Sequence, residues 1–129
     1  MSSIFTKIVN GDIPCHKIAE TDKYLAFLDI MPVGEGHVLV IPKEEIDYFF
    51  DLEDDLMTGL MLFAKEIAIG LKKTIECNRV GVVVAGLEVP HAHVHLIPFS
   101  KIEDIDFDKR MPTDHVALAK TAEQIRTNL

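Results

Sequence analysis

Hydrophobic and polar residues follow two different periods along the chain, and the shorter period predicts strands. β-Branched and aromatic residues are enriched in five short segments, which favours extended structure over helix. The five expected strands are His16–Glu20, Tyr24–Ile30, Gly36–Pro42, Val80–Ala85 and His91–Pro98. The segment 31–36 contains Pro32 and two glycines, so we expect a turn there.

The longer period predicts helices in three other segments. Residues 3–9 can form a short helix that ends at the turn dipeptide Asn10-Gly11. Asp51 is the expected N-cap of a long helix that ends near Lys72-Lys73. The apolar face of this helix consists of Leu56, Leu60, Phe63, Ala64, Ile67 and Leu71. Thr113-Asp114 opens a closing helix. We therefore expect an α+β fold, with an antiparallel sheet of about five strands, one long helix packed on it and short terminal helices.

Composition limits the classes of function. At 129 residues the chain is expected to form one domain, residues 1–129, and a chain of this size would gain stability from dimerisation. The formal net charge of −8 argues against binding to nucleic acid, which needs a basic face. Its two cysteines form no disulfide framework, and we find neither a signal peptide nor a run of apolar residues long enough to cross a membrane. We expect a cytoplasmic protein with a small ligand.

Candidate chemistry concentrates in His91-Ala92-His93-Val94-His95. On a strand, residues two apart point to the same face, and their Cα atoms lie about 6.6 Å apart. The three imidazoles could therefore converge on one ligand. Three interpretations are open at this point: a surface strand rich in histidine, a metal site that needs further ligands, or acid-base and nucleophilic catalysis by imidazole.

Electrostatics constrains the protonation of these histidines. Two imidazolium ions about 7 Å apart repel each other by about 2.4 kcal/mol at an effective dielectric constant near 20. We therefore expect one neutral imidazole, suited to nucleophilic attack, beside one cationic partner near pH 7.

Four segments in this order resemble the histidine triad family of nucleotide hydrolases and transferases, and come nearest to its Hint-like bacterial members. They are Ile4–Pro14, Phe27–Ile30, Gly36–Lys43, and the triad followed by Leu96-Ile97. The resemblance implies the α+β fold described above and a homodimer made by joining two sheets. It also implies a small nucleotide as substrate and no cofactor.

The resemblance assigns roles to individual residues. His93 would attack the α-phosphorus of a nucleoside phosphate derivative and carry the nucleotidyl group, and His95 would contact phosphoryl oxygens. His91 would hold the tautomer of the nucleophile, and His37 would reach the phosphate from a neighbouring strand. Asp29 would accept both ribose hydroxyls. The walls around the base would be Phe5, Ile8, Ile13, Phe27 and Ile30.

This chain departs from the family pattern in two places. Ser3, Thr6 and Glu45 stand where many bacterial members have the two cysteines and the histidine that bind structural zinc with the first triad histidine, so we expect no structural metal. Glu88 falls near the position of a Ser or Thr that donates to phosphate. An ionised carboxylate cannot donate, so Glu88 points away, is protonated or selects a leaving group that bears an amine.

Two functions are compatible with these observations. The chain is either a nucleotidyl hydrolase or transferase, acting on phosphoramidates, dinucleoside polyphosphates or related adducts, or a nucleotide-binding or interaction protein with little catalytic activity. The presence of all four histidines favours the enzyme.

Overall fold

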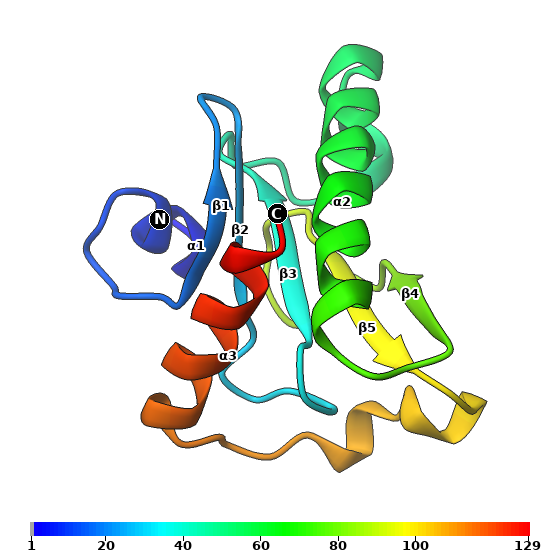
Figure 1. Ribbon diagram of the computed structural model, residues 1–129. Coiled ribbons are helices and arrows are strands. Elements are labelled where there is room, and N and C mark those ends of the chain that lie inside the picture. Colours follow the sequence, from blue (N-terminus) through cyan, green and yellow to red (C-terminus); the bar gives the residue numbers. More distant parts are fainter. Residues whose placement is uncertain (1) are drawn as a thin grey trace.

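The computed structural model describes residues 2–129 and contains one five-stranded sheet (Figure 1). Its strands are β1 (Lys17–Glu20), β2 (Tyr24–Leu28), β3 (Val38–Pro42), β4 (Arg79–Val83) and β5 (Val94–Phe99). They lie in the order β1-β2-β3-β5-β4, and every neighbouring pair is antiparallel. This arrangement confirms the expected α+β fold.

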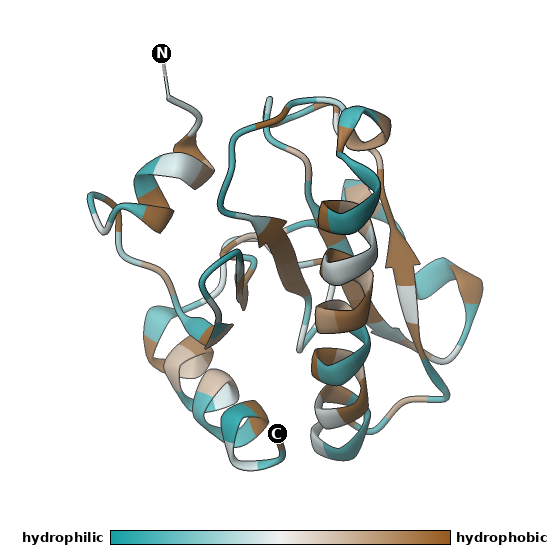
Figure 2. Cartoon of the chain, turned by 90° about the horizontal axis from the view of Figure 1, so that it is seen from above, coloured by the Kyte–Doolittle hydropathy of each residue, from teal (hydrophilic) through white to brown (hydrophobic). Residues whose placement is uncertain are grey.

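Helices α2 (Asp54–Thr74) and α3 (His115–Thr127) cover one face of the sheet (Figure 1). The ribbon of α2 alternates between apolar and polar residues (Figure 2), as expected of a helix with one face buried. Its buried residues include Leu60, Ile67 and Leu71, which pack against apolar side chains of the sheet. The short helix α1 (Ile4–Val9) lies at the far side of β1 and β2.

The strand register divides the central strands between two apolar clusters. Ala26, Val40 and Val94 belong to the main core under α2 and α3. Phe27 and Leu39 are paired across β2 and β3, and they join Phe5 of α1 in a second, smaller cluster. Since Leu39 also pairs with His95 of β5, the register places His95 on the same face as this second cluster.

Several boundaries differ from those expected. β5 begins at Val94, so His91 and His93 precede the strand. Asp51 lies in a 3-10 turn, Phe49–Asp51, and Glu53 occupies the N-cap of α2 instead. Before β3, Gly36 has φ +82°, and a Cβ atom there would lie 2.8 Å from Ile75. This turn therefore requires glycine.

Candidate active site

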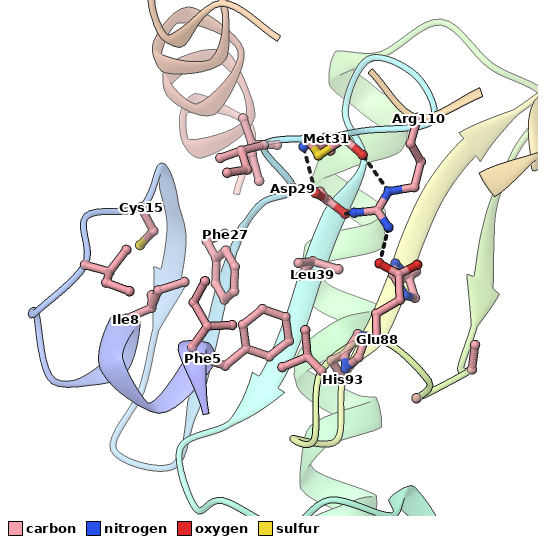
Figure 3. Close-up of a pocket in the computed structure, with 18 of the residues that line it drawn as sticks. Phe5, Ile8, Cys15, Phe27, Asp29, Met31, Leu39, Glu88, His93 and Arg110 are labelled. Atoms are coloured by element: carbon pink, nitrogen blue, oxygen red, sulfur yellow. Dashed lines mark hydrogen bonds and ion pairs between the residues drawn. The ribbon is translucent and has the colours of Figure 1, made fainter. Parts of the chain in front are cut away.

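A cavity of about 460 Å³ opens between α1, the central strands and the loop before β5. Much of its wall is apolar, with Ile8 and Phe27 at one end, while Asp29, Glu88 and Arg110 lie at the other and His93 lies next to Phe5 (Figure 3). The volume suits a small organic ligand. The apolar end can hold a flat ring, and the polar end can hold a charged group.

The ring of His93 is held by the backbone. Its Nδ1 lies 2.7 Å from the carbonyl oxygen of His91. A carbonyl can only accept a hydrogen bond, so Nδ1 carries the proton. In the neutral ring, Nε2 then keeps a free lone pair. His93 is buried and lines the cavity, and the ring of Phe5 packs edge-on against it with centroids 5.1 Å apart.

The ring of His91 is part of a hydrogen-bonded group that we call the Ser3 chain: Ser3, Thr6, Glu45 and His91. Nε2 of His91 donates to the carbonyl oxygen of Pro42, at 2.8 Å, so its Nδ1 accepts from the Ser3 hydroxyl, also at 2.8 Å. The Thr6 hydroxyl and the Ser3 backbone N–H donate to the Glu45 carboxylate. These bonds lower the pKa of Glu45 to about 2.

A second group, the His37 chain, consists of Val33, His37 and His95. The Val33 backbone N–H donates to Nδ1 of His37 over 3.1 Å. His37 therefore carries its proton on Nε2, which lies 2.8 Å from Nδ1 of His95 and donates to it. This leaves the proton of His95 on Nε2, where it can donate to a ligand in the cavity.

Burial keeps the His37 chain uncharged. Desolvation, together with the neighbouring histidines and Arg110, lowers the pKa of His37 to about 3 and that of His95 to about 4. The expectation of a cationic imidazole beside the nucleophile is therefore wrong for His95. The pKa of His91 is also lowered, mainly by burial. The cation at this end of the cavity is instead a guanidinium group.

Arg110 supplies that guanidinium and connects two carboxylates (Figure 3). Its Nη1 donates to Glu88, and its Nη2 lies 3.6 Å from Oδ2 of Asp29. Asp29 is buried, and desolvation raises its pKa. The hydrogen bond from Arg110 lowers the pKa of Glu88. Of the three alternatives for Glu88, protonation is therefore wrong, and so is an orientation away from the cavity.

The structure gathers most of the expected site residues around this cavity. Those that line it are His93, His95, Asp29, Glu88, Phe5, Ile8, Ile13, Phe27 and Ile30. The other two candidates lie behind the lining. The ring of His37 supports His95, whereas His91 contributes its carbonyl oxygen to His93. The expectation that all three triad imidazoles converge on one ligand is wrong, because both nitrogens of His91 are occupied.

Sequence reasoning missed Arg110 and Phe107. Phe107 begins a short 3-10 helix, Phe107–Lys109, and Arg110 directly follows it. The Phe107 ring packs against His95 with centroids 5.0 Å apart. The contact of Arg110 with Asp29 joins residues 81 positions apart in the sequence. No local pattern marks either residue.

One group of potential metal ligands lies close together among residues 2–129: Asp29, His37 and His95, with ligand atoms within 4.8 Å of one another. Its hydrogen bonds oppose metal binding. Nε2 of His37 holds a proton because Nδ1 accepts from Val33, so this nitrogen has no lone pair for a metal. The three-histidine metal site is disfavoured for the same kind of reason, since His91 has no free nitrogen.

Comparison with known proteins places the chain in a family. The HIT domain family model matches residues 10–102, well over half of the chain. The chain belongs to the HIT family. It is 45% identical over 100 residues to adenosine 5'-monophosphoramidase hnt1 of Schizosaccharomyces pombe, and the match covers 76% of this chain and 74% of the yeast protein.

Solved structures of HIT proteins agree with the fold. A HIT-like protein from Bartonella henselae superposes with a TM-score of 0.89 at 29% identity, over 99% of this chain and 96% of that one. A zinc-bound histidine triad family protein from Mycobacterium smegmatis gives a TM-score of 0.85 at 26% identity, over 99% and 93% of the two chains. Within residues 2–129, no helix of this HIT protein is long and apolar enough to span a membrane.

Proposed function

We propose that this HIT protein cleaves nucleotides at the α-phosphate and releases a nucleoside monophosphate. Its substrates would be nucleoside phosphoramidates, dinucleoside polyphosphates or related adducts. The observation that carries the proposal is the fixed pair of tautomers: His93 with a lone pair on Nε2, and His95 with a proton on Nε2, both in the wall of one cavity. The similarity to a yeast adenosine 5'-monophosphoramidase supports it.

The chemistry follows from these two tautomers. Nε2 of His93 attacks the α-phosphorus, so that a P–N bond forms while the bond to the leaving group breaks. The bond from Nδ1–H to the His91 carbonyl stabilises the positive charge that develops on the ring. Nε2–H of His95 donates to a phosphoryl oxygen, where negative charge grows. The leaving group takes up a proton from solvent as it departs. Water then attacks the same phosphorus and returns a proton to solvent, which releases the monophosphate and restores neutral His93.

The rest of the cavity suits a nucleoside. Phe5 and Phe27 pack edge to face, with centroids 5.6 Å apart, and offer an apolar wall to a base. Asp29 has two acceptor oxygens and would bind the ribose hydroxyls. We further propose a single domain over residues 1–129, a cytoplasmic location, and a homodimer in which two sheets join. No metal is required by this scheme.

The decisive experiment removes the attacking nitrogen. His93→Ala should lower kcat for adenosine phosphoramidate by at least about 10³-fold, because His95, the other imidazole in the described lining, holds a proton on Nε2 and cannot form the P–N bond. His115→Ala is the matched control, since this exposed histidine lies at the start of α3, away from the cavity. Acid-sensitive labelling of wild type, but not of His93→Ala, should be seen when turnover is quenched with denaturant.

Two results would count against the proposal. Equal turnover by wild type and His93→Ala would exclude the covalent route. Tight binding of AMP without measurable turnover of any phosphoramidate or dinucleoside polyphosphate would favour the alternative, a nucleotide-binding protein with little catalytic activity.

A further inference from the structure

The polar end of the cavity carries little positive charge for a site that would bind a nucleotide. Among residues 2–129, Arg110 is the only lysine or arginine in the cavity lining, which also contains Asp29 and Glu88. His95, and His37 behind it, are uncharged because burial lowers their pKa values. A phosphate that enters this cavity therefore meets two carboxylates and a single full cation.

The three hydrogen-bonding and ionic partners of Arg110 differ in how easily a ligand could replace them. Its Nε donates to the carbonyl oxygen of Met31, at 2.9 Å, and Nη2 faces Asp29, whose side chain is only 7% exposed. Both partners are fixed in the wall. Glu88, the partner of Nη1, has a side chain that is 64% exposed, so it can turn into solvent at low cost.

We propose that Arg110 binds a phosphate group of the nucleotide, and that Glu88 is the counterion which this phosphate displaces. This proposal rests on the proposed function, because it names the residue that would bind the phosphate of a nucleotide in the same cavity. The bond from Nε to Met31 keeps the guanidinium in place while Nη1 changes partners. Glu88 thus neutralises Arg110 in the free protein, and competes with the phosphate for it.

This assignment makes Arg110 a specificity residue, which separates nucleotides from nucleosides. Adenosine lacks the phosphate, so it can gain from Arg110 only indirectly, through the contact of Nη2 with Asp29. AMP should gain a charged hydrogen bond, which a lysine could replace only in part because it lacks the planar fork of donors.

The test is a calorimetric titration of the full-length protein with AMP and with adenosine. Arg110→Gln should weaken AMP binding about 10- to 100-fold, the range for one charged hydrogen bond, and leave adenosine binding within about 2-fold. Lys109→Gln is the matched control, because it removes the same charge from the adjacent residue, which does not line the cavity. This variant should bind AMP as wild type does.

A double-mutant cycle tests the competition. Glu88→Gln alone should tighten AMP binding several-fold, since the phosphate no longer has to displace a carboxylate. In the Arg110→Gln background, the same substitution should give no more than the gain expected from removing a distant negative charge. A gain of equal size in both backgrounds would contradict the proposed exchange.

The outcomes separate this proposal from the function on which it rests. Unchanged AMP binding in Arg110→Gln, or an equal loss for AMP and adenosine, would overturn the role of Arg110 even if His93→Ala abolishes turnover. Binding of AMP that depends on Arg110, without turnover by wild type, would uphold the role of Arg110 and overturn the enzyme. No binding of AMP to wild type would overturn the role of Arg110, while turnover of adenosine phosphoramidate would still decide the enzyme.

Discussion

The Ser3 chain and the His37 chain both orient a histidine, but they do so through different atoms. The Ser3 chain holds the ring of His91, yet only the backbone carbonyl of His91 reaches His93. The His37 chain acts through side chains throughout, and its last member, His95, faces the cavity. The first chain also includes the half-buried Thr6 and the exposed Glu45, whereas His37 is almost completely buried.

This difference separates stability from catalysis. A backbone carbonyl stays in place when a nearby side chain is replaced, as long as the loop keeps its shape. A side-chain relay fails when any member is lost, because each tautomer depends on the one before it. We therefore expect substitutions in the His37 chain to lower kcat, and substitutions in the Ser3 chain to lower the free energy of unfolding.

Of the two hydrogen-bonded groups, the His37 chain is expected to give the larger effect when it is broken, although this effect is smaller than that of His93→Ala. His37→Phe fills much of the same volume but donates nothing to His95, so the proton of His95 is no longer confined to Nε2. We expect kcat for adenosine phosphoramidate to fall about 10- to 100-fold with little change in KM, because the lost bond acts on the transition state. Steady-state kinetics measure this effect.

His37→Gln is the matched variant for this experiment. Its amide can accept from Val33 and donate to His95, so it should recover part of the lost kcat. If His37→Phe and His37→Gln give the same kcat, the His37 chain does not affect catalysis by fixing the tautomer of His95.

A smaller effect, on stability, is expected from the Ser3 chain. Ser3→Ala removes the donor to Nδ1 of His91 and the N-cap of α1, where the Ser3 hydroxyl accepts from the Thr6 N–H. We expect the free energy of unfolding to fall by about 1–3 kcal/mol, the cost of a buried nitrogen without its partner. Denaturant titration measures this change.

The exposed neighbour Ser2 provides the control, and Ser2→Ala should leave the unfolding midpoint unchanged. kcat of Ser3→Ala should stay within a few-fold of wild type, because the His91 carbonyl remains. If Ser3→Ala lowers kcat as much as His37→Phe does, the Ser3 chain matters for catalysis as much as the His37 chain, which contradicts the difference described above.

The smallest effect is expected from metal removal. Among residues 2–129, the partners of the His91 ring are Ser3, Thr6 and the Pro42 carbonyl, with Glu45 bonded to Thr6, and these groups offer neither a thiolate nor a second imidazole to zinc. A chelator should change neither the melting temperature nor the turnover, and the purified protein should contain much less than one equivalent of zinc by elemental analysis. Stoichiometric zinc that stabilises the fold would mean that the Ser3 chain rearranges around a metal.

The sequence predicted those parts of the site that depend on local spacing. The alternation around Leu39 and Val40 correctly located β3, and the resemblance to the family identified the residues of the cavity wall. Spacing misplaced the start of β5, because the backbone N–H groups of His91 and Ala92 donate to the carbonyl oxygens of Val89 and Ile46 instead of joining the strand ladder.

Long-range contacts account for what was missed. Arg110 meets Asp29 and Glu88 only after the segment that follows β5 folds back over the cavity. The tautomers could not be predicted either, because they depend on partners such as the Val33 N–H, which a sequence does not place next to a given ring nitrogen.

The three uncharged, buried histidines also link folding to proton uptake. His37, His91 and His95 have lowered pKa values in the folded protein, to about 3 for His37 and about 4 for His95, and they regain a value near 6.5 when the chain unfolds. At pH values between the folded-state and unfolded-state pKa values, the unfolded chain binds more protons than the folded protein. The free energy of unfolding therefore decreases as the pH falls below about 6.5. Acid should therefore unfold the protein with net consumption of protons, and replacing His37 with Gln should make the dependence of stability on pH shallower.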